Sequence, residues 1–393
     1  MQIGLIGFTL VNENKGCEAL TYSLVGMLAD VLAGIKTEIL IFSSEMCQGY
    51  LPDIYPEFSY RCEKASLKNG DLIRMIKSCD VIFDATYGDG FSDIYFLRPM
   101  FKNVLIKYIA GISKSVFVLA PQTYGPFHNK VLEKFSGLAI RKANYVFARD
   151  EISAQYAKKI SHRDIKTVTD LAFSMPYKRD MYPNIDNAIG INVSGLLWRG
   201  GFSSSNQFSL KSNYKDYTLK LIQYIIISTT KNIYLISHVT NPTGYEGVVA
   251  DDDYIACMEC KNNNFKDNSR VIVGPKFRNP VEAKSFISNM SSFIGARMHA
   301  TIAAFSSGVI TIPVAYSRKF QGLYENINYQ YIVDLCKLDT EHAMEITISY
   351  LNQSESLHSA QVNAMNMVQE KLTDYRTNME NIFNYDLKIR MIQ

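Results

Sequence analysis

The chain has 393 residues, of which 47% are apolar and 20% charged, and its formal net charge is +3. This length is enough for two ordinary domains, and the composition is that of a soluble globular protein rather than a disordered one. Lys and Arg are spread along the chain, so no dense basic tract points to nucleic acid.

The first half of the chain alternates short apolar, β-branched runs with helical stretches, which is typical of a parallel sheet with crossover helices. The predicted strands are Gln2–Phe8, Glu38–Phe42, Val81–Phe83, Val116–Leu119 and Tyr145–Phe147. The predicted helices run from about Cys17 to Leu32 and over Leu67–Lys77, Met100–Ala110 and Lys130–Ala143.

A polar, proline-bearing stretch, Pro176–Asn187, interrupts this pattern, and we place the domain boundary there. The strands predicted beyond it are Ala188–Val193, Asn232–Ile236, Val271–Val273, Ser292–Ile294 and Val309–Pro313. The helices predicted beyond it are Asp216–Thr229, one near Tyr254–Asn262, Pro280–Asn289, Met298–Ser306 and a long one from about His358 to Phe383.

These elements predict an α/β protein with two Rossmann-like domains facing a cleft, over residues 1–180 and 181–350. Residues 351–393 form a helical segment that can pack back on the first domain. In such sheets ligands bind beyond the carboxyl ends of the strands, where the strand order reverses. We therefore expect the functional residues directly after strands.

Three features of the chain bear on its location. The first residues, MQIGLIGF, enter a strand at once, so no signal peptide is expected, and the longest apolar run, Leu219–Ser228, is too short for a membrane span. Seven cysteines form no disulfide framework in a chain of this length, and their odd number favours a reducing compartment. Cys257 and Cys260 form a single C-x-x-C without a second pair, which predicts two buried thiols rather than a zinc site. The protein is expected in the cytoplasm, which leaves open a peripheral association with the inner face of the cytoplasmic membrane.

The strongest functional segment is Ile294–Phe320, where a strand ends at Gly295 and a helix begins near Arg297. A helix N-terminus favours an anion, and Arg297 adds a charged fork suited to carboxylate or phosphate. His299 adds a group that exchanges a proton near neutral pH. The alternative is that Arg297 fixes a loop through an ion pair and that His299 is a surface histidine.

A second segment, Phe83–Phe96, follows a strand and carries two glycines and three acidic residues, Asp84, Asp89 and Asp93. The acids can position hydroxyl groups or accept a proton, and the alternative is a tight turn with helix-capping aspartates. No histidine or second acidic cluster lies near in sequence, so no metal site is expected.

A third segment, Gly7–Leu20, joins a strand to a helix but has neither G-x-G-x-x-G nor a P-loop lysine. A dinucleotide or ATP site is therefore not supported. Asn14 and its neighbours still supply polar groups at this strand end. No Ser–His or Cys–His pair has the spacing of a nucleophile elbow.

Eight short motifs occur in a fixed order. They are N-x-G-x-E-A (Asn14–Ala19), a glycine–aspartate turn ending in Asp93, Q-x-x-G-P-F (Gln122–Phe127), R-D-x-x-S (Arg149–Ser153), D-x-A-F (Asp170–Phe173), N-x-S-G (Asn192–Gly195), G-x-R-x-H-A (Gly295–Ala300) and A-Y-S-x-K (Ala315–Lys319). As an ordered set they resemble the polysaccharide pyruvyl transferase family, up to about Tyr331. Cys17 departs from the family's usual aspartate, and Thr86, Tyr87 and Gly88 stand where it often has three glycines.

The resemblance implies a GT-B-like fold and an enzyme that moves a pyruvyl group from phosphoenolpyruvate onto a sugar, forming a pyruvate ketal. The sugar belongs to a cell-surface polysaccharide, such as a capsule or exopolysaccharide, or to its lipid-linked precursor. No metal and no organic cofactor is expected, since phosphoenolpyruvate is a co-substrate. The acceptor sugar, its hydroxyl pair and the ketal stereochemistry are not determined, and a homo-oligomer is left open.

The resemblance also implies the roles of individual residues, with the donor on the second domain and the acceptor on the first. His299 is the candidate for proton transfer, and Asp89 and Asp93 are candidates for orienting the acceptor hydroxyls. The donor set is Arg297, Met298, His299, Arg199, Ser194 and Lys319. The acceptor set is Asn14, Glu18, Asp89 and Tyr124.

Two other functions remain as alternatives. A GT-B-type glycosyltransferase using a nucleotide sugar would hold the diphosphate with Arg297, although its C-terminal helix often carries a glutamate that the stretch ATIAAFSSG lacks. A sugar- or anion-binding module would keep the site but need no proton donor, so that His299→Gln would preserve ligand affinity.

Overall fold

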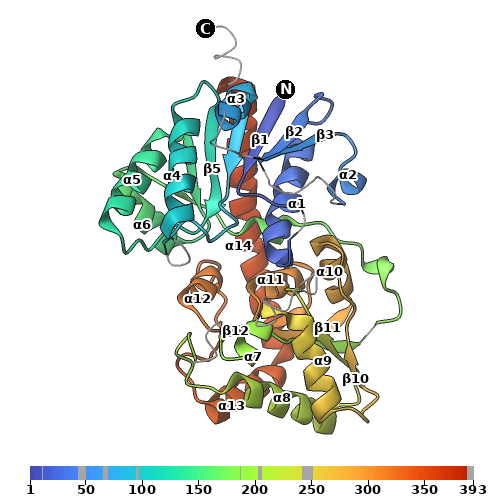
Figure 1. Cartoon of the computed structure of the whole chain (residues 1–393). Helices are drawn as coiled ribbons and strands as arrows, with labels where there is room; N and C mark the ends of the chain where they lie inside the picture. The colour runs from blue at the N-terminus through green and yellow to red at the C-terminus, as the bar shows by residue number, and fades with distance from the viewer. Residues whose placement is uncertain are drawn as a thin grey trace. The chain divides into compact units, whose positions relative to one another are not determined.

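The computed structural model describes residues 1–10, 12–42, 50–64, 70–93, 97–185, 187–201, 206–240 and 251–386. The chain divides into two compact units (Figure 1). Unit 1 consists of Met1–Asn12, Leu20–Ser174 and Val368–Gln393, and unit 2 consists of Glu13–Ala19 and Met175–Met367. The chain therefore passes from one unit to the other four times.

Unit 1 is built on a seven-stranded parallel sheet with the order β3-β2-β1-β4-β5-β6-β7. Its strands are β1 (Gln2–Ile6), β2 (Glu38–Phe42), β3 (Ser59–Glu63), β4 (Val81–Asp84), β5 (Val116–Gln122), β6 (Tyr145–Ala148) and β7 (Lys166–Thr167). The strand order reverses between β1 and β4, because the chain builds outward from β1 in one direction and from β4 in the other.

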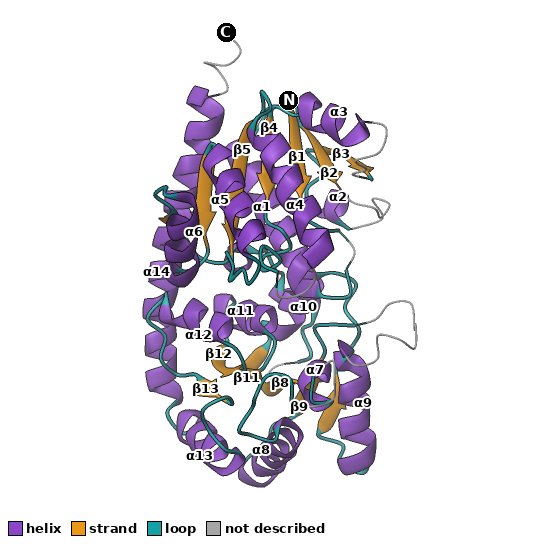
Figure 2. Cartoon of the chain, turned by 60° about the vertical axis from the view of Figure 1, so that its left-hand side comes forward, coloured by secondary structure: helices purple, strands orange, loops and turns teal. Residues whose placement is uncertain are grey.

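The helices of unit 1 are the part of α1 (Lys15–Val31) from Leu20 on, α2 (Leu51–Ile54), α3 (Asp71–Ser78), α4 (Leu97–Gly111), α5 (Lys130–Lys142), α6 (Glu151–Ser161) and the last part of α14 (Ser354–Asn381). Helices α4, α5 and α6 lie side by side along one face of the sheet (Figure 2). On the other face, Phe147 packs against Tyr375 with ring centroids 4.8 Å apart, and Phe83 contacts Phe383.

Unit 2 has a six-stranded parallel sheet with the order β10-β9-β8-β11-β12-β13. Its strands are β8 (Ala188–Asn192), β9 (Ile233–Ile236), β10 (Val271–Val273), β11 (Met290–Gly295), β12 (Ile310–Ala315) and β13 (Val333–Asp334). Its helices are α7 (Gly195–Trp198), α8 (Tyr214–Ser228), α9 (Asp253–Asn264), α10 (Pro280–Ile287), α11 (Met298–Ser306), α12 (Arg318–Glu325), α13 (Thr340–Leu351) and the first part of α14. The strand order reverses here between β8 and β11.

The predicted fold class is confirmed, because both units are parallel α/β sheets with crossover helices. Among the described residues, three strands were not predicted: β3 is polar and only partly buried, while β7 and β13 are two residues long. The start of the predicted helix Leu67–Lys77 lies outside the described residues, and α3 begins at Asp71.

The predicted linker, Pro176–Asn187, belongs to unit 2 for a physical reason. The Lys178 N–H donates to Ser285 Oγ at 2.9 Å, and Lys284 Nζ donates to the Met175 carbonyl at 2.7 Å. Both bonds tie this stretch to α10. At the other end of unit 2 the boundary falls inside α14, between Met367 and Val368, so that residues beyond it lie in unit 1.

The cysteines have simple roles in the structure. Cys257 and Cys260 are fully buried in α9, as the prediction of two packed thiols requires. Five of the described cysteines carry free thiols, so they form no disulfide framework, while Cys62 is disulfide-bonded.

Candidate active site

The strand-order reversal of unit 2 is spanned by one buried side chain, that of Asn192 at the end of β8. Its Oδ1 accepts the N–H of Arg297 at 2.8 Å, and its Nδ2 donates to the Ile236 carbonyl at 2.9 Å. One amide therefore fixes the ends of β8 and β9 to the loop after β11. This is the crevice where parallel sheets bind ligands.

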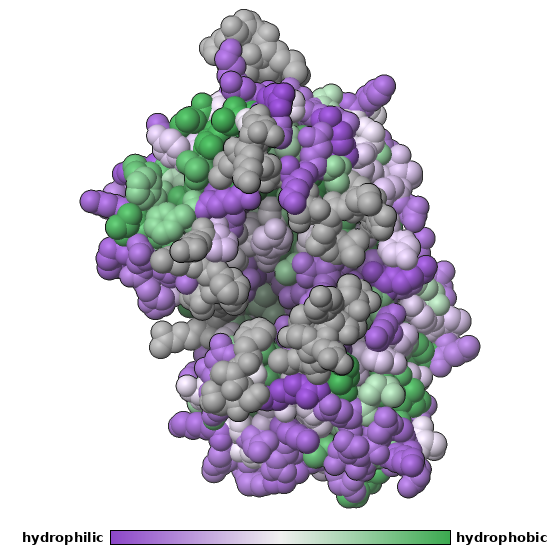
Figure 3. All heavy atoms as spheres, viewed as in Figure 1, coloured by the Kyte–Doolittle hydropathy of each residue, from purple (hydrophilic) through white to green (hydrophobic). Residues whose placement is uncertain are grey.

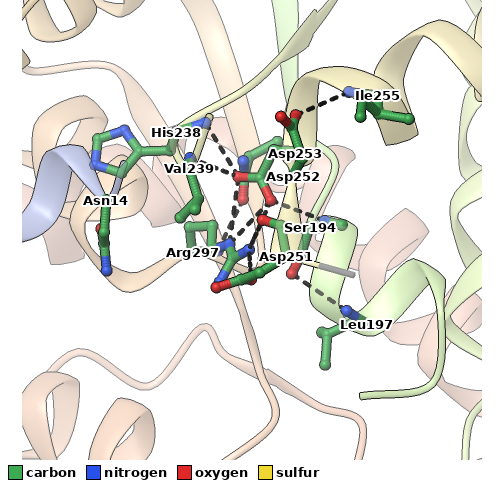
Figure 4. Close-up of polar contacts among 12 residues, drawn as sticks. Asn14, Ser194, Leu197, His238, Val239, Asp251, Asp252, Asp253, Ile255 and Arg297 are labelled. Carbon is green, nitrogen blue, oxygen red and sulfur yellow. Dashed lines mark hydrogen bonds and ion pairs between the residues drawn. The ribbon is translucent and has the colours of Figure 1, made fainter. Parts of the chain in front are cut away.

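Asp253, the first residue of α9, is completely buried beside this amide and accepts hydrogen bonds from three backbone groups. Its Oδ1 accepts the Gly195 N–H at 2.8 Å, and its Oδ2 accepts the N–H groups of His238 and Val239 at 3.0 Å each. Figure 4 shows this carboxylate between those backbone groups and the Arg297 guanidinium. Asp253 therefore joins the loops after β8 and β9 to α9.

The guanidinium of Arg297 forms an ion pair with Asp253, from Nη2 to Oδ1 at 2.7 Å and from Nε to both oxygens at 3.1 and 3.2 Å. Its Nη2 also contacts the Asp251 carboxylate. Burial acts to lower the pKa of Arg297, but the two carboxylates outweigh it and hold that pKa well above its usual value. The guanidinium therefore keeps its charge at neutral pH. On the other side of the pair, burial raises the pKa of Asp253, and Arg297 opposes this shift.

The sequence analysis left open that Arg297 has a structural role in an ion pair, and the structure contains that ion pair. It also contains the predicted helix start. Arg297 is the N-cap residue of α11. Nε and Nη2 are engaged, whereas Nη1 makes no hydrogen bond to any residue within the described ranges. One amino group of the fork is thus left over for a ligand.

His299 lies in the first turn of α11, and its half-buried ring packs against the start of α1. A Cβ placed on Gly16 would meet His299 Nδ1 at 2.2 Å and Cγ at 2.6 Å. The segment carrying Gly16 is held by the loop after β9, because the Lys15 N–H donates to the His238 carbonyl and the Thr240 N–H to the Glu13 carbonyl. An isolated bridge also pairs Asn14 with Val239. The N-x-G-x-E-A motif therefore forms one wall of the site around His299.

His238 is a second histidine of this site, only 2% exposed. Neither ring nitrogen has a hydrogen-bond partner in the part of the chain that the structure describes. Burial lowers the pKa of His238 well below its usual 6.5, and the neighbouring His299, Arg297 and Lys15 act in the same direction. His238 is therefore neutral at physiological pH.

We expect His238 to make the protein less stable in mild acid. In the unfolded chain a histidine takes up its proton near pH 6.5, whereas folded His238 does not. The unfolded state then binds more protons, so stability falls as pH falls below that value, by up to about 1.4 kcal/mol per pH unit. Urea unfolding of wild type and His238→Gln at about pH 7.5 and about pH 5.5 measures this, and the variant should show the flatter profile.

A matched control is His342→Gln in α13. Asp339 raises the pKa of this exposed histidine, so its contribution has the opposite sign, present in acid and lost as pH rises. Its removal should leave the acid loss in place. An unchanged acid loss in His238→Gln would contradict the assignment.

The remaining predicted donor residues are spread beyond the ends of β8, β11 and β12. Arg199 ends α7 and pairs with Glu259 at 2.7 Å. The buried Ser194 hydroxyl caps α7 by accepting the Leu197 N–H at 3.4 Å, and Met298 is half-buried at the start of α11. Lys319 lies in α12, but its side chain is outside the described residues.

The four predicted acceptor residues do not share one unit. Asn14 and Glu18 belong to unit 2, where the buried Glu18 carboxylate pairs with Lys15 at 2.6 Å and Asn14 Oδ1 accepts the Gly16 N–H at 2.9 Å. Asp89 is half-buried in unit 1. Tyr124 is buried there and donates to the Phe147 carbonyl at 3.0 Å, so we leave it out of the proposed site.

Asp93, a predicted catalytic residue, serves as a turn anchor in unit 1. Its carboxylate accepts the His128 N–H at 2.8 Å and the Asn129 N–H at 2.7 Å. Asn129 in turn caps α5, since its side chain accepts from Val131 and Leu132. This arrangement corresponds to the turn-and-cap alternative, so we leave Asp93 out of the proposed site as well.

A cavity of about 180 Å³ lies at the strand-order reversal of unit 1. Its floor is the buried pair of Lys107 Nζ and Asp84 Oδ2, 2.9 Å apart, and its rim carries Lys64 and Lys102. Two rim residues, Thr86 and Tyr87, have φ angles of 44° and 58°, a left-handed backbone that non-glycine residues seldom adopt. Sequence reasoning missed Lys107 because its partner Asp84 is 23 residues away.

Among the described residues no group of three or more histidine, cysteine, aspartate or glutamate side chains is placed to hold a metal ion. Nor is any described helix long and apolar enough to cross a bilayer.

Three solved structures are similar to this chain over almost its whole length. They are Staphylococcus aureus MnaA with UDP (11% identity, 98% of this chain and 97% of that chain, TM-score 0.60), the Neisseria meningitidis UDP-GlcNAc 2-epimerase bound to UDP-GlcNAc (11%, 95% and 100%, 0.51) and Anabaena Alr3699/HepE in complex with UDP and glucose (12%, 98% and 99%, 0.57). At this identity the likeness establishes the fold alone, which is GT-B.

The family follows from the sequence. The family model "Polysaccharide pyruvyl transferase" matches residues 14–318, well over half of the chain. The chain therefore belongs to the polysaccharide pyruvyl transferase family, as the ordered motifs indicated. No curated protein matches it in sequence.

Proposed function

We propose that the protein transfers a pyruvyl group from phosphoenolpyruvate to two hydroxyl groups of one sugar, forming a ketal on a cell-surface polysaccharide or its lipid-linked precursor. Family membership supports a pyruvyl transferase. The observation that carries the donor assignment is that Arg297, with its Nη1 not engaged by any described residue, and His299 both lie at the start of α11, at the crevice of unit 2. The proposed reaction uses neither a metal nor an organic cofactor.

The donor is an anion, and the start of α11 suits one. The first N–H groups of a helix have no partner within the helix, and its dipole adds positive charge there. Arg297 Nη1 adds a charge-assisted hydrogen bond to a carboxylate or phosphate oxygen. Asp253 keeps the guanidinium in place, so little ordering is required when the donor binds.

The chemistry requires one proton at the methylene carbon of phosphoenolpyruvate. The C=C electron pair takes this proton from the His299 imidazolium, which leaves an oxocarbenium-like centre at the neighbouring carbon. A sugar hydroxyl attacks that carbon and loses its proton. A second hydroxyl of the same sugar then displaces phosphate, losing its own proton. His238 is neutral in the free protein, so it does not supply this proton.

For the acceptor we propose the cavity of unit 1. It combines the exposed Tyr87 ring, which suits a sugar face, with the lysines Lys64 and Lys102 and with Asn103. Its volume of about 180 Å³ is below the roughly 300–1,000 Å³ of sites for drug-sized ligands, so it suits a single sugar unit. The strained backbone of Thr86 and Tyr87 supports a functional role.

The test is release of inorganic phosphate from phosphoenolpyruvate against a panel of free and lipid-linked glycans, with and without a chelator. We expect acceptor-dependent release that the chelator does not affect, and a product that carries one pyruvate ketal by mass spectrometry. Release of UDP from a UDP-sugar with no use of phosphoenolpyruvate would favour the glycosyltransferase. Binding of phosphoenolpyruvate without turnover on any glycan would favour the binding module.

Gly16→Ala should inactivate the enzyme without unfolding it. The new methyl group would occupy the position of His299 Nδ1, so the imidazole must move. Alanine is the better helix former by roughly 0.5–1 kcal/mol, so the start of α1 should stay intact. A displaced catalytic group of this kind costs on the order of 10² in rate.

The matched control is Cys17→Ala at the next residue of α1. Turnover and thermal unfolding of both variants, measured side by side, check the prediction. Normal turnover in Gly16→Ala would mean that the position of the His299 ring is not critical.

A further inference from the structure

The outer layer of unit 1 exposes an unusual number of large apolar side chains. Fifteen such side chains are exposed among the described residues, and seven of them lie on or directly after α4, α5 and α6. These seven are Phe101, Leu105, Ile112, Val131, Phe135, Leu138 and Ile152, and we call them the apolar face. Figure 3 shows apolar atoms gathered over the region of α4 and α5.

The apolar face is formed by helices that pack against one another. Val131, Phe135 and Leu138 follow each other at helical spacing on α5, with exposed fractions of 56%, 52% and 36%. The opposite side of α5, with Ile140, is buried in the core of unit 1. The exposed residues are thus a second apolar stripe, which packing inside unit 1 does not explain.

The exposed charge on the same three helices is mostly positive. Seven of their exposed side chains are basic, namely Lys102, Lys130, Lys134, Arg141, Lys142, Lys158 and Lys159. Against these, the described acidic side chains that are not buried are the exposed Glu151 and the half-buried Glu133. Apolar residues among basic ones match a bilayer surface, where acyl chains accept the former and anionic headgroups the latter.

A second copy of the chain is a poorer match for this face. A symmetric dimer places the same patch of both subunits in contact, which would bring these lysines against each other. Like charges across an interface oppose association, whereas an anionic surface attracts them.

We propose that the protein docks on anionic membranes through the apolar face, with α5 lying at the headgroup boundary. Val131, Phe135 and Leu138 enter the interface, and Lys134, Arg141 and Lys142 contact lipid phosphates. Docking of this kind would bring unit 1 to the bilayer, where a lipid-linked glycan is presented. The proposal concerns a surface, so it does not depend on the donor chemistry.

The experiment is co-sedimentation of the full chain with two kinds of vesicle, phosphatidylcholine alone and phosphatidylcholine with an equal part of phosphatidylglycerol. We expect binding to the anionic vesicles that weakens in high salt. The apolar variant Val131→Ser/Phe135→Ser/Leu138→Ser and the basic variant Lys134→Gln/Arg141→Gln/Lys142→Gln should each lose about tenfold or more in vesicle affinity.

Two control variants carry the same kinds of substitution elsewhere. Ile227→Ser/Val362→Ser removes exposed apolar side chains of α8 and α14, and Lys36→Gln/Lys178→Gln/Lys266→Gln removes exposed charges. Both should bind anionic vesicles like the wild type. Unfolding temperature and turnover on a water-soluble acceptor should be unchanged in all four variants, which separates docking from folding and from catalysis.

The proposal is overturned if the wild type does not bind anionic vesicles, or if the control variants lose as much affinity as the variants of the face. If light scattering shows that the wild type is a dimer and the apolar variant a monomer, the apolar face binds a second copy of the chain instead of a membrane. If phosphoenolpyruvate is not a substrate but vesicle binding follows the expected pattern, the proposed function fails while this surface stands.

Discussion

Replacing His299 with glutamine is expected to lower turnover by roughly 10²–10⁴-fold, the usual contribution of a general acid. Glutamine retains a hydrogen-bonding group in the first turn of α11 but cannot pass a proton to carbon. The affinity for phosphoenolpyruvate should change only several-fold, because Arg297 Nη1 and the helix N-terminus remain. Saturated turnover and equilibrium donor binding, measured for both proteins, give the two numbers.

The pH profile supplies a second readout. A general acid must carry its proton, so the wild-type rate should fall on the basic side of its profile, and the residual activity of His299→Gln should lack this limb. The control is His358→Gln, which removes an exposed histidine of α14. Near-normal turnover with an intact basic limb in His299→Gln would exclude His299 as the acid. His238 would be an unfavourable replacement, since its pKa is lowered by burial.

Asp253→Ala should cost about 3–5 kcal/mol of folding stability, the range for breaking a buried ion pair. The substitution leaves the buried Arg297 guanidinium without its main partner and leaves three backbone N–H groups, those of Gly195, His238 and Val239, without their acceptor. Urea unfolding followed by circular dichroism measures the loss.

The neighbouring Asp252→Ala is the matched control, because it removes the same side chain one residue earlier. Asp252 is buried too, but its carboxylate caps α9 through the Ile255 N–H, a contact worth about 1 kcal/mol. A double variant, Arg297→Met/Asp253→Leu, should be more stable than Asp253→Ala alone, because no unpaired charge remains. Equal losses in Asp252→Ala and Asp253→Ala would show that the ion pair adds nothing beyond a helix cap.

These contacts change the role expected for Arg297, which the sequence assigned mainly to binding the donor. As a sequence motif, R-x-H after a strand predicts a free charged fork. In the structure, the same guanidinium is the partner of a completely buried carboxylate, so Arg297→Ala should lower stability as well as donor affinity. Of the guanidinium nitrogens, only Nη1 takes no part in the ion pair, so it is the atom available to the donor.

The fold could be predicted because its signal is local. Runs such as Val116–Leu119 are apolar over consecutive residues and contain β-branched valines, which predicts a buried strand. The position of Arg297 at the start of α11 followed from the same local pattern. Polar edge strands such as β3 carry no such signal, because neither face is fully buried.

The partners of the site residues could not be predicted, because they come from distant parts of the chain. Asp253 lies 44 residues from Arg297, and nothing in the sequence around it distinguishes it from Asp251 or Asp252. From the sequence, Gly16 is an ordinary glycine at a helix start, and only the structure shows that it lies against the His299 ring. The roles of Asp253 and Gly16 therefore depend on the fold, which brings each of them next to its partner in the site.

The repeated passage of the chain between its two units has a consequence for synthesis on the ribosome. Unit 2 needs Glu13–Ala19 from the start of the chain, and unit 1 needs the part of α14 that begins at Val368. At about 5–20 residues per second, most of the chain is translated before either unit can close. Until then the strand faces that receive Tyr375 and Phe383 are uncovered. The nascent chain should therefore depend on chaperones for longer than one whose domains are contiguous.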